Sequence, residues 1–213
     1  MKEFTSFLGD LAIYISPIVA IIYLISFIRN DKIYKVFTIY LIAMALVQIS
    51  SHYVGRGGLN KTNLYFSHIF YISQFIILSI FYLKLLSKKI IVYLLLIVLL
   101  LISIQFINDP SIFFRYNPIG MSFTQIILVV YSIIYLYKSL TNKGEFVIVN
   151  IGILIYLLSS TLIFASGNLV LDLNISKETR LVLVNVNRML SIIFQILVFI
   201  EWYRNYRIRV SRN

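Results

Sequence analysis

Seven long apolar stretches take up nearly all of this 213-residue chain, and only short loops separate them. A helix needs about 20 apolar residues to cross the hydrocarbon core of a bilayer, and each stretch is close to that length. We expect helices because the strands of a membrane barrel would alternate apolar and polar residues. The prediction is an all-α, polytopic membrane helix bundle in which residues 1–213 form one transmembrane domain.

The seven predicted spans are Leu11–Ile28, Ile33–Ser50, Tyr65–Leu86, Ile90–Ile107, Met121–Tyr137, Phe146–Ser166 and Leu181–Tyr203. The first of them has no basic region directly before it, so we expect it to be a retained helix rather than a signal peptide. No internal repeat is visible, and the spans do not divide into two matching halves, which counts against an inverted-repeat transporter.

The composition excludes several kinds of site. Only 13% of the residues are charged, against about 25% in soluble domains. The chain has no cysteine, which excludes disulfides, thiolate nucleophiles and iron–sulfur clusters. The two histidines, His52 and His68, have no carboxylate near them at depth, so we predict no metal site. We find no H-E-x-x-H or G-x-S-x-G motif, and we expect a non-enzymatic protein without a cofactor.

Lys and Arg are distributed unevenly between the two sets of alternate loops. Six basic residues lie on the side of the N-terminus, and twelve lie on the other side with the C-terminal tail. Because cytoplasmic loops are enriched in Lys and Arg, we predict an outside N-terminus and a cytoplasmic C-terminus. The abundance of Ile, Phe, Lys and Asn is typical of AT-rich bacterial genomes, so we expect the bacterial inner membrane. The net charge of +11 reflects this topology, and we expect no direct nucleic-acid partner.

Polar residues in the third and seventh spans form two stripes at similar depth, in the outer half of the predicted bundle. At about 100° per residue, each stripe falls on one face of its helix. We expect the two stripes to line one ligand-binding cavity that opens outward. The alternative is that they hydrogen-bond neighbouring helices, for about 0.6 kcal/mol each. The third-span stripe begins with Asn63 and Ser67. The residues of the two stripes that we expect to bind the ligand are His68, Tyr71 and Gln74 in the third span and Asn187, Arg188, Ser191 and Gln195 in the seventh.

Arg188 lies roughly two turns inside the outer end of the last predicted span. It can snorkel to the headgroups, because helical side chains lean toward the helix N-terminus. Alternatively, its planar guanidinium faces the cavity and binds a carboxylate, a phosphate or a lipid headgroup. We identify no Asp or Glu deep in any span, which leaves water, a backbone carbonyl or a ligand as its partner. The same expectation counts against a proton-coupled or sodium-coupled transporter.

The C-terminal tail combines aromatic residues with arginines just past the last span. An anionic membrane surface attracts such a tail with about 1 kcal/mol per basic residue. We therefore predict a contact with the lipid bilayer or with a cytoplasmic signalling or effector protein through Arg204, Arg207, Arg209 and Arg212.

Three segments carry a resemblance to a group of small seven-span bacterial membrane proteins. They are H-I-F-Y-I-S-Q-F-I-I-L-S-I-F-Y at 68–82, V-N-I-G-I-L-I-Y-L-L-S-S at 149–160 and N-R-M-L-S-I-I-F-Q-I-L at 187–197. The chain resembles this uncharacterised family over most of its spans. In that group a Glu often stands where Gln74 stands here, so the resemblance implies that this chain has lost an intramembrane carboxylate. It also implies seven helices, without an established activity.

Three functions fit these observations. The favoured hypothesis is a membrane sensor or accessory protein that binds a small or lipidic ligand from outside and acts through a separate cytoplasmic partner. A second is a channel or pore-forming effector, including an accessory protein of a bacterial antiviral system of the CRISPR type, and a homo-oligomer with stripes facing a central axis would favour it. The third is a transporter.

Overall fold

A computed structural model of the chain describes residues 2–56, 63–141, 144–165 and 176–207. These residues form seven α-helices and one short 3-10 helix: α1 (Lys2–Ile25), α2 (Lys32–Arg56), α3 (Tyr65–Leu86), α4 (Ile90–Asn108), η1 (Pro110–Phe114), α5 (Pro118–Thr141), α6 (Val147–Ala165) and α8 (Lys177–Asn205). Six of these helices are long and apolar enough to cross a membrane, and α6 contains a shorter apolar stretch, Val147–Ile163. The predicted all-α bundle is confirmed, and its apolar helices suggest a multi-pass membrane protein.

The helices agree with the predicted spans in position, but most of them are longer. The third prediction has the same bounds as α3, whereas α1 begins at Lys2 instead of Leu11. The added turns of α1 carry Phe4, Phe7 and Leu8 at helical spacing, which extends the apolar face toward the N-terminus. Ser166, the predicted end of the sixth span, lies outside the described residues.

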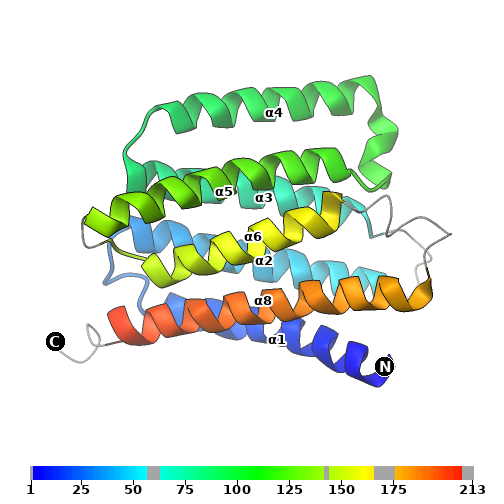
Figure 1. Cartoon of the computed structure of the whole chain (residues 1–213), viewed down its shortest axis with the longest axis horizontal. Coiled ribbons are helices and arrows are strands. Elements are labelled where there is room, and N and C mark those ends of the chain that lie inside the picture. Colours follow the sequence, from blue (N-terminus) through cyan, green and yellow to red (C-terminus); the bar gives the residue numbers. More distant parts are fainter. Residues whose placement is uncertain (1, 57–62, 142–143, 166–175, 208–213) are drawn as a thin grey trace.

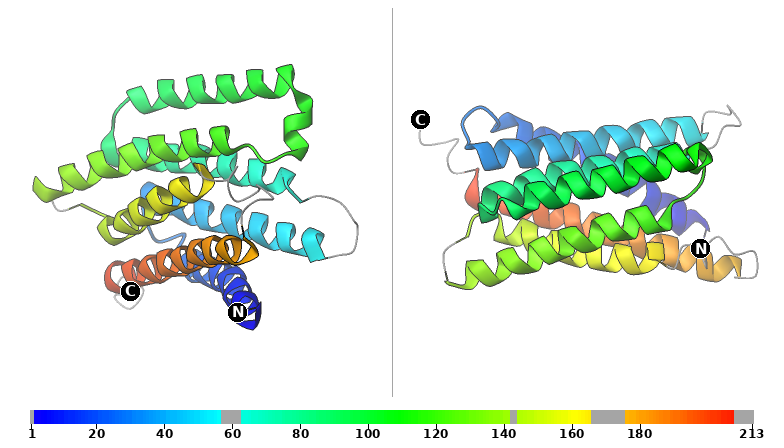
Figure 2. Two further views of the ribbon diagram at one scale, coloured as in Figure 1. Left: turned by 45° about the vertical axis from the view of Figure 1, so that its right-hand side comes forward. Right: turned by 90° about the horizontal axis from the view of Figure 1, so that it is seen from above.

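The bundle consists of two layers of three helices, with α4 beside them (Figure 1). Helices α1, α2 and α3 form one layer, and α8, α6 and α5 form the other. The layers are joined at their edges, because α1 packs against α8 and α3 packs against α5. Figure 2 shows the same arrangement from two further sides, with α4 outside the six-helix ring and packed against α3. The start of α1 and the end of α8 lie at opposite ends of the bundle.

Aromatic side chains fill the bundle at the end where α8 finishes. Tyr34 stacks on Tyr23 with ring centroids 5.1 Å apart, and it also meets Tyr206 at 4.6 Å. Phe146 lies 5.5 Å from Phe37 and 5.2 Å from Tyr206. All five residues are at most 5% exposed. This cluster joins α1, α2, α6 and the end of α8, and it closes the interior at this end.

One polar group lies deeper and connects three helices. Tyr82 of α3 donates a hydrogen bond to Asn150 Oδ1 of α6 at 2.5 Å. Asn150 Nδ2 donates to the carbonyl oxygen of Ser132 on α5 at 3.0 Å, and Ser132 Oγ donates back to Asn150 Oδ1 at 3.1 Å. Asn150 and Ser132 have no exposed surface, so this network joins the two layers in the buried interior of the bundle.

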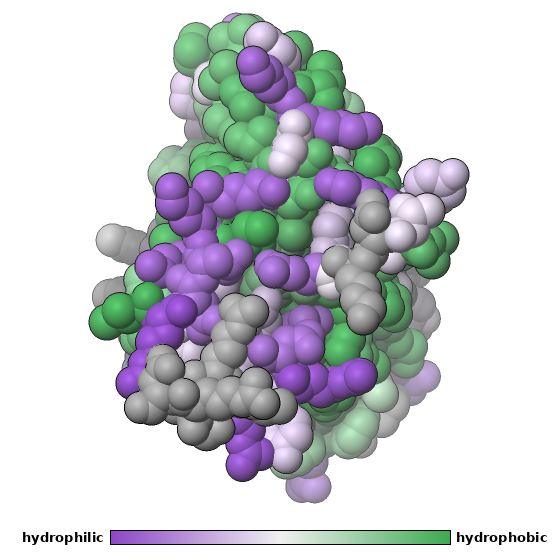
Figure 3. Space-filling view, turned by 90° about the vertical axis from the view of Figure 1, so that its left-hand side faces the viewer, coloured by the Kyte–Doolittle hydropathy of each residue, from purple (hydrophilic) through white to green (hydrophobic). Residues whose placement is uncertain are grey.

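The end where α8 finishes is also the basic end. Figure 3 looks at this end and shows hydrophilic side chains gathered over it, with apolar side chains along the flanks. The described basic residues of the predicted cytoplasmic loops therefore gather at one end of the bundle. The exposed basic residues at this end are Arg29, Lys32, Lys84, Lys88, Lys89, Lys138, Arg204 and Arg207.

Candidate ligand-binding cavity

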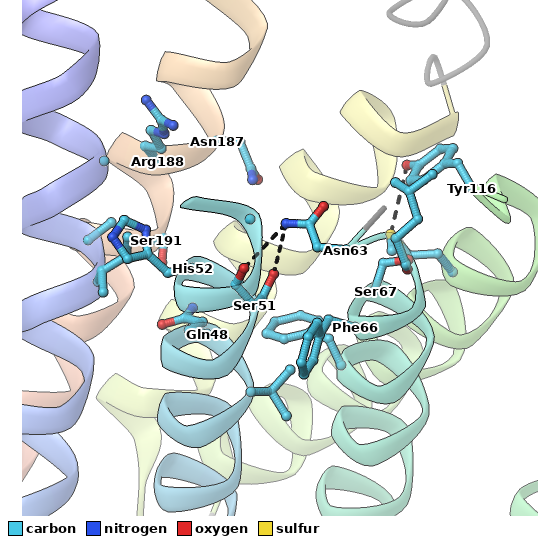
Figure 4. A pocket seen from close by; sticks show the side chains of 18 of the residues that line it. Gln48, Ser51, His52, Asn63, Phe66, Ser67, Tyr116, Asn187, Arg188 and Ser191 are labelled. Carbon is cyan, nitrogen blue, oxygen red and sulfur yellow. Dashed lines mark hydrogen bonds between the residues drawn. The ribbon is translucent and has the colours of Figure 1, made fainter. Parts of the chain in front are cut away.

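A cavity of about 640 Å³ lies at the opposite end, where α1, α3 and α8 begin. This volume is within the range of about 300 to 1,000 Å³ that small-molecule sites occupy. Side chains from both layers line it, and Figure 4 shows its polar residues from close by. The polar lining residues are Gln48, Ser51 and His52 of α2, Asn63 and Ser67 at the start of α3, Tyr116, and Asn187, Arg188 and Ser191 of α8.

Arg188 is half-buried in the wall between α8 and α1. Its Nη1 donates a 2.6 Å hydrogen bond to the carbonyl oxygen of Thr5. A Cβ added to Gly9 would lie 3.0 Å from the Arg188 Cζ and 3.2 Å from each Nη atom, so the flat face of the guanidinium rests on Gly9. The partner is thus a backbone carbonyl near the N-terminus of α1. Arg188 therefore lines the cavity with its guanidinium held against the first turns of α1.

Of the seven residues predicted to bind the ligand, three line the cavity: Asn187, Arg188 and Ser191. His68 and Tyr71 are buried and face the loop before α5. His68 Nε2 lies 2.9 Å from the carbonyl oxygen of Arg115, and because a carbonyl can only accept, this nitrogen carries the proton. The Tyr71 hydroxyl lies 3.4 Å from the other ring nitrogen, Nδ1.

The two predicted glutamines lie deeper than the cavity. Gln74 is 1% exposed and donates a 3.2 Å hydrogen bond to the hydroxyl of Tyr40 on α2. Gln195 is 4% exposed and lies one turn beyond Ser191 on α8. The cavity is therefore shorter than the two stripes. It ends before Gln74 and Gln195, which are packed in the interior of the bundle.

Asn63 and Ser67, which belong to the polar stripe of the third predicted span, also line the cavity. Gln48, Ser51 and His52 of α2 were not among the residues predicted to bind the ligand. Asn63 Nδ2 lies 3.3 Å from the Ser51 carbonyl oxygen and 3.4 Å from the Ser51 hydroxyl, which ties α3 to the end of α2 (Figure 4). Gln48, Ser51 and His52 come late in α2, at the same end of the bundle as Arg188. The sequence signal for these α2 residues was a cluster of polar side chains at the end of the second span. Such a cluster is equally typical of a helix that simply ends among the lipid headgroups.

A second cavity, of about 560 Å³, lies on another face of α3. His68 and Ser73 are its polar lining residues, and the rest of its wall is apolar. Phe106 and Phe113 contribute aromatic rings, 5.3 Å and 5.8 Å from the imidazole of His68. His68 is already engaged with Arg115, so the polar chemistry of the molecule is concentrated in the first cavity.

Glu201 corrects the expectation that no Asp or Glu is buried in a span. It has no exposed surface, although it lies near the end of α8. Its Oε2 accepts hydrogen bonds from the backbone N–H groups of Ile148 at 2.9 Å and Val149 at 3.4 Å, and its Oε1 accepts one from the Asn205 side chain. These contacts account for both carboxylate oxygens. Glu201 therefore serves as a cap for α6, and its burial does not indicate ion coupling.

The structure describes two of the four arginines for which a tail contact is predicted. Arg204 and Arg207 are exposed at the basic end, and the Arg207 guanidinium lies 4.6 Å from the ring centroid of Tyr203. Arg209 and Arg212 lie outside the described residues. No cluster of three or more potential metal-ligating side chains occurs in the ranges that the structure describes.

No family model, no curated protein and no solved structure matches this chain. The resemblance to a seven-span bacterial family therefore stays a prediction.

Proposed function

We propose that this chain is a seven-span protein of the bacterial inner membrane that works as a non-enzymatic sensor or accessory protein. Its N-terminus lies outside and its C-terminus in the cytoplasm, as the excess of Lys and Arg at the C-terminal end supports. A small or lipidic ligand enters the outward-facing cavity, and a separate cytoplasmic protein receives the signal at the basic end.

One observation carries this proposal. The half-buried guanidinium of Arg188 lines a cavity of ligand size, at the end opposite the basic surface. A charged side chain within a span is costly in lipid, and such residues commonly mark ligand or ion pathways. The aromatic cluster that closes the other end supports a binding pocket rather than a pore through one chain.

The test is ligand-dependent thermal stability of the purified protein in a neutral detergent. A total lipid extract of the host membrane should raise the melting temperature of the wild-type protein. Arg188→Ala should remove most of this gain, whereas Gln74→Leu should keep it, because Gln74 lies below the cavity and contacts Tyr40. An equal gain in all three proteins would contradict the proposed site.

A further inference from the structure

The charge of the cavity lining selects the ligand that it can hold. Arg188 carries a permanent positive charge, and no Asp or Glu occurs among the described residues that line the cavity. His52 and Ser191 add groups that can donate hydrogen bonds. An uncompensated guanidinium among neutral donors favours an oxyanion, such as a carboxylate or a phosphate group.

The position of the guanidinium leaves most of its donors available. An arginine side chain has five N–H donors, and within the described ranges Arg188 uses one of its nitrogens, Nη1, in the hydrogen bond to Thr5. Gly9 covers one flat face, and the guanidinium edge that carries the other N–H donors lies outside that contact. Edge-on approach is the geometry in which an arginine binds an oxyanion through two parallel hydrogen bonds.

The remaining wall of the cavity is apolar and comes from five helices. Ile13 of α1, Val47 of α2, Phe66 and Phe70 of α3, Met121 of α5 and Tyr156 of α6 line it. A bare inorganic anion would gain no binding free energy from this wall. Burial of apolar surface contributes about 25 cal/mol per Å² only when the ligand also has apolar surface to bury.

From these two halves of the lining we infer that the cavity binds an amphipathic anion. Its oxyanion head contacts Arg188, and its apolar chain lies against Phe66, Phe70 and Met121. This inference rests on the proposed outward-facing ligand site and names its ligand class. A free single-chain acid and an anionic lipid of the outer leaflet carry the same chemistry, so the experiment has an arm for each.

The first arm compares three soluble probes by titration against the purified protein in a neutral maltoside detergent. Laurate has both halves of the ligand, methyl laurate lacks the charge, and acetate lacks the chain. Laurate should bind at least tenfold more tightly than either of the others. Arg188→Ala should weaken laurate binding about tenfold to a hundredfold, which corresponds to the loss of one charge-assisted contact. Lys84→Ala, which removes an exposed positive charge at the other end and outside the arginine tail, should leave it unchanged.

A second variant separates the position of the charge from its presence. In Gly9→Ala the new Cβ meets the guanidinium at 3.0 Å and moves it off its place on α1, while Arg188 itself is retained. The displaced group is the far end of a flexible side chain, so the fold should tolerate the change. Laurate should bind several-fold more weakly with little change in melting temperature.

The second arm measures thermal stability in nanodiscs of phosphatidylglycerol or of phosphatidylcholine. Higher stability in phosphatidylglycerol that disappears in Arg188→Ala identifies a lipid as the source of the anion. Selective laurate binding without this lipid effect identifies a free acid. Failure of both arms overturns the inference.

A cavity-filling variant, Ser191→Trp, distinguishes this failure from failure of the proposed site. Equal binding of laurate and methyl laurate, lost in Ser191→Trp, refutes the anion but keeps the cavity. Laurate binding that survives Ser191→Trp refutes the cavity itself.

Discussion

Glu201 provides a helix cap from a distant part of the chain, and its removal has a calculable cost. Phe146 precedes α6 with a left-handed backbone (φ 59°), and its carbonyl oxygen accepts the first hydrogen bond of the helix, from Asn150. Its side chain has no oxygen, so it cannot satisfy the free N–H groups of the first turn. Glu201 does so instead, by accepting from Ile148 and Val149.

The magnitude follows from two contributions. Loss of a capping side chain costs about 0.5–2 kcal/mol, and a carboxylate at a helix N-terminus adds up to about 2 kcal/mol in a partly buried setting. Because Glu201 has no exposed surface, water replaces it poorly. We expect Glu201→Ala to lower the free energy of unfolding by about 2–4 kcal/mol, and Glu201→Gln by about 1–2 kcal/mol.

The assay is equilibrium unfolding by dodecyl sulfate in mixed micelles, followed by circular dichroism. Glu145→Gln is the control for Glu201→Gln, because it makes the same chemical change on an exposed side chain near the same end of the bundle. It should stay within about 0.5 kcal/mol of the wild-type protein. A wild-type free energy of unfolding for Glu201→Ala would refute the capping role.

Three further perturbations test the packing of the bundle. Asn150→Leu removes the contacts to Tyr82 and Ser132 and should cost about 1–3 kcal/mol in the same unfolding assay; a neutral result would show that the network adds no stability. Phe37→Ala in the aromatic cluster should cost about 3–5 kcal/mol, because Phe37 has no exposed surface. Leu96→Ala on the outer face of α4, where Leu96 is 59% exposed, should cost less than about 1 kcal/mol, and a cost equal to that of Phe37→Ala would contradict the peripheral position of α4.

Sequence patterns predicted the helices well because the bilayer imposes a strong length requirement on each apolar stretch. The bounds of α3 agree fully, and the polar stripe of α8 contributes three residues to the cavity. The place of Arg188 against Gly9 was not predictable, because it depends on which helix packs beside α8. The capping role of Glu201 escaped detection for the same reason, since its partners are 52 and 53 residues away in the chain.

The depth of the cavity was overestimated from helical periodicity alone. Gln74 and Gln195 share a face with the residues above them, but a stripe does not indicate where packing closes around it. Gln74 is used for the contact with Tyr40, and the bundle is filled at that level. The shared face indicated which side of each helix points to the interior. The depth of the cavity depended on the helices that pack against α3 and α8.

The most direct test of the outward-opening cavity uses the absence of cysteine from the natural chain. Ser191→Cys places a single thiol in the cavity, and Lys88→Cys places one at the basic end. A membrane-impermeant maleimide added to intact spheroplasts should modify the Ser191→Cys protein and should reach the Lys88→Cys protein only after lysis. Modification of Lys88→Cys in intact spheroplasts, with Ser191→Cys protected until lysis, would contradict the orientation and the proposed site together.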